Sequence, residues 1–170
     1  MASRTLVSVE EYLRTSYRPD CDYVDGEIVE RNVGELDHSD LQSEIVVYFR
    51  SRTKKLGVFA YVEQRVQVSS TRFRIPDVCV LTSKPPDQIF RTPPFIVIEI
   101  LSKDDRISQM QERIDDYLNF GVPYVWMIDR RTRRAWIHTK AGSQESKDGI
   151  LRTENPAIEL PLPEIFDALE

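Results

Sequence analysis

The stretch FIVIEIL at residues 95–101 decides the fold, because it is apolar on both faces except for one acid, Glu99. A strand of this kind is typical of the buried centre of a sheet. A second apolar stretch, RIPDVCVL at residues 74–81, carries the acid Asp77, 22 positions before Glu99. A carboxylate in an apolar strand costs free energy unless it is paired, hydrogen-bonded or bound to a metal. The two stretches therefore predict neighbouring strands that share one polar site.

The rest of the sequence predicts an α/β (α+β) fold, in which a mixed β-sheet is flanked by helices. Asp25-Gly26 is a hairpin turn signal, and Ser39 and Gly57 are expected to cap the two ends of a long helix. A β-α-β crossover makes the strands at 95–101 and 123–129 parallel. The elements expected in chain order are a helix at 8–14, a hairpin at 22–29, a helix at 40–57, strands at 60–68, 73–81 and 95–101, a helix at 106–120, strands at 123–129 and 134–139, an exposed mobile loop at 140–150 and an edge strand at 158–163.

Length and composition fit a soluble globular protein. The 170 residues are 41% hydrophobic and 30% charged, which is enough for one domain with a real core, expected over residues 1–170. No apolar run approaches the length of a membrane span, and the N-terminus lacks the apolar core of a signal peptide. Cys21 and Cys79 form no close metal-ligand motif. We expect no membrane association and a cytoplasmic location.

The charge balance limits how the chain can bind nucleic acid. A net charge of −5 argues against broad, non-specific coating, but it leaves room for a local basic groove. Two basic clusters are the places to look for phosphate contacts, although short charge runs are more often solvated surface. The clusters are Arg130, Arg131, Arg133 and Arg134, and Arg50, Arg52, Lys54 and Lys55.

Strand alternation decides whether the two acids can meet. Asp77 shares a face with Cys79, and Glu99 shares a face with Val97. If these faces coincide, the carboxylates can hold one hard divalent cation such as magnesium, with the carbonyl of Ile100 as a third ligand. In the alternative, Asp77 caps a turn and Glu99 pairs with an arginine. Spacing alone favours neither.

The same residues resemble the PD-(D/E)XK nuclease superfamily, which has the restriction-endonuclease-like fold. More narrowly, the chain is similar to a large bacterial family of uncharacterised proteins classed as restriction endonucleases, over about residues 8–139. The motifs that carry the likeness are Ile75-Pro76-Asp77 with Val97-Ile98-Glu99-Ile100-Leu101-Ser102, the hairpin residues Tyr23, Val24, Asp25, Gly26 and Glu27, then His38, and finally Tyr117, Gly121, Val122, Trp126 and Asp129.

The resemblance implies phosphodiester hydrolysis in a nucleic acid, expected to be DNA, with Mg²⁺ or Mn²⁺ bound by Asp77 and Glu99. The superfamily places a catalytic lysine two residues after the glutamate, where this chain has Leu101. In the narrower family that lysine has often moved to the next helix, at the position of Arg113. An arginine stabilises phosphate charge but stays protonated, so it is a poor general base. In the alternative, Arg113 is an exposed charge paired with Asp116.

Four other residues are weaker candidates for the site. Glu27 resembles a family acid at the site edge, Glu44 is a candidate acid on the first long helix, and Lys103 is a substitute lysine close to Glu99. For His38, helix capping is favoured over chemistry. A duplex-cutting enzyme needs two sites, so a homodimer is expected. The departures from the lysine pattern favour one rival function, an inactive nuclease-fold interaction module, while a two-carboxylate glycosidase is a distant third.

Overall fold

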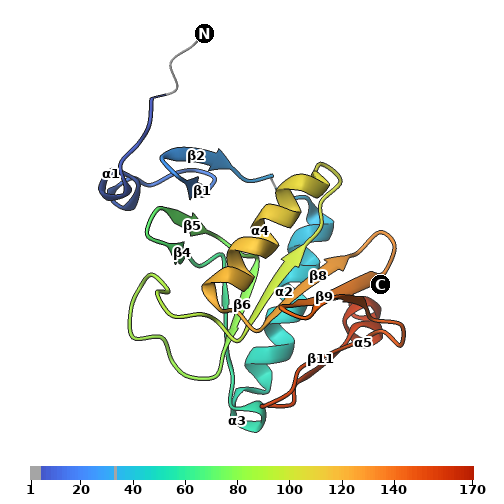
Figure 1. Ribbon diagram of the computed structural model, residues 1–170. Coiled ribbons are helices and arrows are strands. Elements are labelled where there is room, and N and C mark those ends of the chain that lie inside the picture. The colour runs from blue at the N-terminus through green and yellow to red at the C-terminus, as the bar shows by residue number, and fades with distance from the viewer. Residues whose placement is uncertain (1–4, 33) are drawn as a thin grey trace.

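The computed structural model describes residues 5–32 and 34–170, which form three sheets with helices packed on both sides (Figure 1). The strand orders are β10-β9-β8-β7-β6-β3, β2-β1-β5-β4 and β11-β12. The predicted mixed sheet flanked by helices is confirmed. The strands are β1 (Cys21–Val24), β2 (Glu27–Glu30), β3 (Phe59–Val62), β4 (Val66–Ser69), β5 (Arg72–Arg74), β6 (Val78–Leu81), β7 (Ile96–Ile100), β8 (Tyr124–Asp129), β9 (Arg134–Thr139), β10 (Gly142–Glu145), β11 (Ile150–Arg152) and β12 (Glu159–Pro161), and the helices are α1 (Val9–Arg14), α2 (Leu36–Ser51), α3 (Thr53–Leu56), α4 (Ile107–Phe120) and α5 (Leu162–Asp167).

Strand β7 is the centre of the six-stranded sheet, as its composition predicts. All five of its residues are buried. It pairs antiparallel with β6 and parallel with β8, and α4 connects it to β8. The predicted crossover with parallel strands is therefore confirmed.

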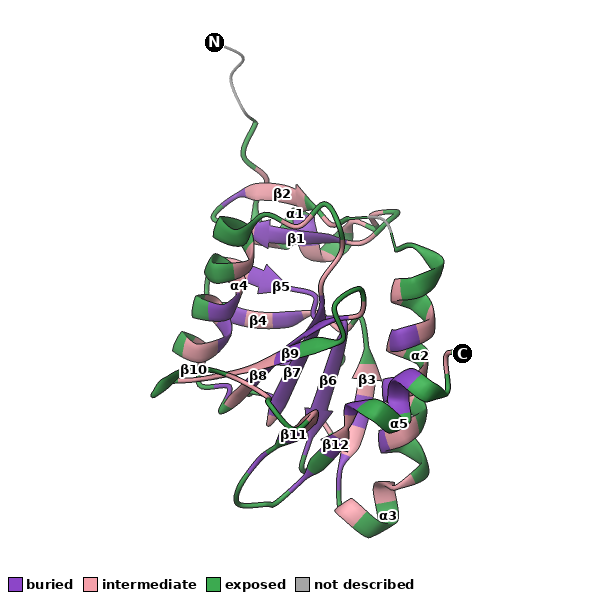
Figure 2. Ribbon diagram, turned by 90° about the vertical axis from the view of Figure 1, so that its right-hand side faces the viewer, coloured by how far each residue is buried: buried purple, intermediate pink, exposed green. Residues whose placement is uncertain are grey.

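The two faces of the six-stranded sheet pack against different helices, so alternate residues of each strand enter different cores (Figure 2). Val78, Val80 and Ile98 join the core under α2, whereas Cys79 and Val97 join the core under α4. None of the described helices is long and apolar enough to cross a lipid bilayer.

Two of the predicted strands are each divided between two sheets. The span 60–68 forms β3 in the six-stranded sheet and β4 in the four-stranded sheet, and the chain turns between them at Glu63, whose φ is +46°. The span 73–81 divides in the same way into β5 and β6. The division falls around Pro76, which has no N–H group to donate to a ladder. Asp77 therefore lies where the chain passes from one sheet to the other.

Three further predictions of local structure are wrong. Helix α2 begins at Leu36 rather than after Ser39, so His38 lies in its first turn. The expected mobile loop at 140–150 instead contains β10 and the start of β11. The 3.6-residue period of α4 predicts that Ile107 shares a buried stripe with Ile114 and Tyr117, but Ile107 is the first residue of the helix and is 90% exposed.

Candidate functional site

The pairing of β6 with β7 brings the two acids opposite each other. Cys79 pairs with Val97 across the ladder, and the same antiparallel register continued by two residues places Asp77 opposite Glu99. Both side chains lie on the face that α4 covers, and each residue is only 3% exposed. They border a pocket of about 490 Å³. The faces therefore coincide, which is the condition for a shared site.

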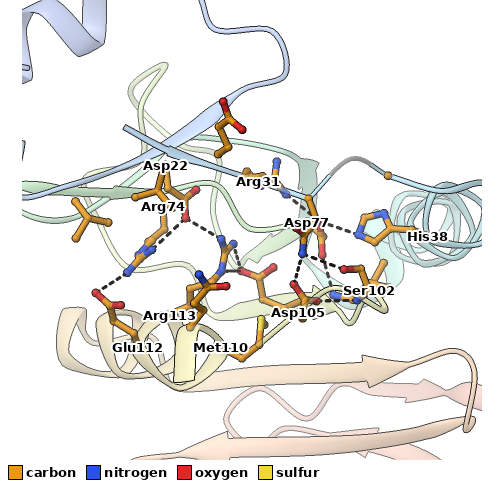
Figure 3. A pocket seen from close by; sticks show the side chains of 18 of the residues that line it. Asp22, Arg31, His38, Arg74, Asp77, Ser102, Asp105, Met110, Glu112 and Arg113 are labelled. Carbon is orange, nitrogen blue, oxygen red and sulfur yellow. Dashed lines mark hydrogen bonds and ion pairs between the residues drawn. The ribbon is translucent and has the colours of Figure 1, made fainter. Parts of the chain in front are cut away.

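Each carboxylate oxygen of Asp77 has its own partners (Figure 3). Its Oδ2 accepts a hydrogen bond of 2.7 Å from the backbone N–H of Ile100. Its Oδ1 lies 3.0 Å from Arg31 Nη2 and 3.2 Å from His38 Nε2. Burial opposes the charge, but the hydrogen bond from His38 and the charges of His38 and Arg31 outweigh it, so the pKa of Asp77 is lowered. Asp77 is ionised at neutral pH.

Glu99 is in a different electrostatic state, although it faces Asp77. Its Oε1 accepts hydrogen bonds of 2.5 and 3.1 Å from Arg113 and one of 2.6 Å from the hydroxyl of Tyr117. Burial raises the pKa of Glu99 to about 7, and the neighbouring Asp77 charge adds to the rise, while Arg113 opposes it. The two carboxyl groups thus have pKa values that are pushed apart, as in sites that handle protons.

Arg113 points into the site from α4. It donates to Asp22 Oδ2 at 2.7 Å and to the carbonyl of Ile75 at 3.2 Å, in addition to Glu99. The alternative of an exposed arginine paired with Asp116 is wrong, because Asp116 binds Arg72 and Arg74 instead. Burial disfavours the charge on Arg113, but Asp22 and Glu99 outweigh it and raise the pKa well above its usual value.

Residues 9–170 match the sequence model of the Uma2 family, described as "Putative restriction endonuclease". The chain belongs to the Uma2 family. A crystal structure from Anabaena variabilis, described as "a putative nuclease belonging to DUF820", has a similar fold, with a TM-score of 0.84. The two chains are 23% identical, and the match covers 96% of this chain and 99% of that one. No curated protein matches the chain. The family and the fold confirm the resemblance to restriction-endonuclease-like nucleases.

Three charged residues of this Uma2 site were missed by the sequence analysis. Asp22, on β1, accepts from the N–H of Ile75 and pairs with Arg74 at 3.2 Å. Arg31 binds Asp77 from the segment between β2 and α2. An acid beside the buried Tyr23 and an arginine at the start of RIPD are visible signals, but spacing does not show that they converge. His38 does not cap the helix, because α2 begins at Leu36 with Glu35 at the N-cap. The imidazole of His38 lies 3.2 Å from Asp77 Oδ1.

The weaker candidates separate into those at the pocket and those outside it. Glu27 lines the pocket. Glu44 and Lys103 are absent from the described lining residues, and Lys103 forms an exposed ion pair of 2.6 Å with Glu35. The cluster at residues 130–134 is largely neutralised: its ion pairs are Arg130 with Asp37, Arg131 with Asp129, Arg133 with Glu170, and Arg134 with Glu145.

The donor atoms at the centre of the site are oxygens, which is the ligand type that a hard cation such as Mg²⁺ prefers. Asp77 and Glu99 supply carboxylate oxygens, and Ile100 lines the same pocket. Within residues 5–32 and 34–170, no group of three or more His, Cys, Asp or Glu side chains is arranged to hold a metal ion. In this arrangement arginines neutralise both carboxylates, Arg31 on Asp77 and Arg113 on Glu99. A cation would have to compete with these pairs.

Proposed function

We propose that the protein is a metal-dependent nuclease that hydrolyses phosphodiester bonds in DNA. The observation that carries the proposal is the register that sets Asp77 opposite Glu99 in a buried polar pocket. Membership of the Uma2 family supports the same reaction class. Carboxylates on neighbouring strands are suitable ligands for Mg²⁺ or Mn²⁺.

The residues have distinct roles in this proposal. Asp77 and Glu99, with the carbonyl of Ile100, would hold the divalent cation. When bound, such a cation stabilises charge on a phosphoryl oxygen and lowers the pKa of bound water. Arg113 orients Glu99 through two hydrogen bonds and supplies fixed positive charge at the pocket. Because its pKa is raised further by Asp22 and Glu99, it cannot serve as the general base.

The pocket holds hydrogen-bond donors for phosphate groups beside its acids. Arg31, Arg74, Arg113 and His38 line it together with seven acidic residues, so phosphate contacts would be limited to these cationic side chains. The acids are Asp22, Glu27, Glu30, Asp77, Glu99, Asp105 and Glu112. Guanidinium groups bind phosphate oxygens through paired N–H donors. Binding is therefore expected to be local to this pocket. Cleavage of both strands of a duplex would use two copies of the site, which a homodimer provides.

Cleavage by matched variants tests the proposal. The wild type, Asp77→Asn, Glu99→Gln and Asp115→Asn would each be incubated with plasmid DNA, single-stranded DNA or RNA, with Mg²⁺ or Mn²⁺. Asp115 is an exposed acid on α4 and serves as the control. We expect the two site variants to lose more than about hundredfold in rate and the control to lose none. Equal rates in all four proteins would refute the proposal.

One observation favours a second function, an inactive nuclease-fold interaction module. Both carboxylates are neutralised by arginines, and Leu101 stands where the superfamily has its catalytic lysine. This function predicts nucleic-acid binding with no cleavage under any metal condition. Metal-dependent cleavage that Glu99→Gln abolishes would exclude it.

A further inference from the structure

Two arginines occupy the carboxylates of the site, and they are held very differently. Arg113 lies on a helix and donates to Glu99, Asp22, the carbonyl of Ile75 and the hydroxyl of Tyr117. Arg31 lies outside any helix or strand. Among the described residues it donates one hydrogen bond, 3.0 Å to Asp77 Oδ1. Arg31 is therefore the arginine that can leave its carboxylate with the smaller loss of contacts.

The oxygen of Asp77 that Arg31 contacts is also contacted by His38 Nε2, at 3.2 Å. The other oxygen accepts a hydrogen bond of 2.7 Å from the backbone N–H of Ile100, so Oδ1, whose partners are side chains, is the oxygen that can exchange a partner for a cation. The backbone beside Arg31 is anchored, because Asn32 donates to Ser102 at 3.1 Å and to Asp105 at 2.8 Å. The guanidinium can thus change partner while its backbone stays in place.

Electrostatic repulsion favours such a change. A divalent cation bound to Asp77 Oδ1 would lie beside the guanidinium of Arg31, which is 3.0 Å from the same oxygen. Like charges at so short a separation repel, so release of Arg31 from Asp77 lowers the energy of the metal-bound site. A phosphate group beside the site offers Arg31 a new partner.

We infer that Arg31 is an internal counter-cation, which occupies the cation position on Asp77 Oδ1 and transfers to a substrate phosphate when a divalent cation binds. The inference rests on the proposed metal-dependent function. It has two separable consequences: removal of Arg31 tightens metal binding, and Arg31 contributes to nucleic-acid binding only when the metal is present.

Calorimetric titration with Mn²⁺ alone tests the first consequence. Arg31→Gln is expected to bind Mn²⁺ about ten- to hundredfold more tightly than the wild type, the equivalent of one charge-assisted hydrogen bond. Lys103→Gln removes the same charge from the neighbouring loop without contact to Asp77, and we expect a change below about threefold. Arg31→Lys keeps the charge and should lie close to the wild type. Thermal melting of each variant checks that it folds.

The second consequence is tested by the salt dependence of binding to a labelled DNA duplex. With Ca²⁺ present, the slope of log affinity against log salt should be smaller by about one in Arg31→Gln than in the wild type. With a chelator present the two slopes should coincide, because Arg31 is then engaged with Asp77. The same difference in both conditions, or no difference in either, would overturn the inference.

The Mn²⁺ titration also separates failure of the inference from failure of the proposed function. If Asp77→Asn abolishes binding while Arg31→Gln binds no more tightly than the wild type, Arg31 is not a competing cation and the inference fails alone. If neither the wild type nor Arg31→Gln binds Mn²⁺, or if Asp77→Asn binds it unchanged, the metal site on Asp77 fails and the inference fails with it.

Discussion

Removal of Arg113 should change how the stability of the protein depends on pH. Burial raises the pKa of Glu99 to about 7, and the positive charge of Arg113 limits this rise because it favours the ionised carboxylate. The unfolded state has an ordinary glutamate pKa of about 4.5. Between these two pKa values the folded state binds more protons than the unfolded state, so the free energy of unfolding falls as pH rises. In the wild type this fall ends near pH 7, where Glu99 becomes ionised in the folded state.

In Arg113→Met the pKa of Glu99 is expected to be higher than in the wild type. The free energy of unfolding should then keep falling above pH 7. Each pH unit is worth about 1.4 kcal/mol, so from about pH 7 to 8.5 the variant should lose about 2 kcal/mol more than the wild type. This comes in addition to a cost of about 3 to 5 kcal/mol for breaking a buried ion pair.

Urea unfolding at several pH values measures this difference. Arg113→Lys retains the charge and should follow the wild-type pH profile. Its stability should be lower, because lysine cannot reproduce the hydrogen bonds of the guanidinium group to Asp22 and to the carbonyl of Ile75. Arg106→Met, at the exposed start of the same helix, controls for loss of an arginine. If the pH profiles of Arg113→Met and the wild type are parallel above pH 7, Glu99 is not the group that Arg113 keeps charged.

Three other changes have defined outcomes. Asp22→Asn removes the carboxylate that holds Arg74 and Arg113, so we expect a loss of about 3 kcal/mol in urea unfolding. A loss below about 1 kcal/mol would contradict the described ion pairs. The affinity for Mn²⁺ should rise about fivefold from pH 6 to 7, about twofold more by pH 8, and level off above, because the cation displaces the Glu99 proton. Calorimetry that gives one affinity across this range would show that Glu99 is not a ligand. Gly26→Ala should cost about 1 kcal/mol or more, since φ is +94° and the new Cβ would lie 3.2 Å from Leu6. An unchanged melting temperature would exclude this strain.

The sequence was sufficient to predict the centre of the fold and that the two acids lie on neighbouring strands. The apolar runs, the crossover helix and the strand alternation are local patterns, whereas the register that brings the face of Asp77 onto the face of Glu99 is seen only in the structure. The division of 60–68 and 73–81 between two sheets was not predictable in the same way. Each span keeps strand-like composition through the bend, which only Pro76 and the positive φ of Glu63 mark.

The ion pairs of the site were also beyond sequence reasoning. Asp22, Arg31 and Arg74 lie on separate elements, and their convergence depends on how the four-stranded sheet packs beside the six-stranded one. The place of Arg113 in the site was predictable from the family resemblance alone, which aligns it with the lysine that has moved to this helix. Of the two interpretations of Glu99, the structure contains the pairing with an arginine, and that arginine is Arg113.

The central claim is that Asp77 and Glu99 form one divalent-cation site for nucleic-acid hydrolysis. Calorimetric titration of Mn²⁺ into the wild type and Glu99→Gln, with Mn²⁺-dependent plasmid cleavage measured on the same samples, tests it most directly. We predict that the wild type binds and cleaves, and that binding and cleavage are lost together in the variant. Mn²⁺ binding and cleavage that persist unchanged in Glu99→Gln would contradict the account.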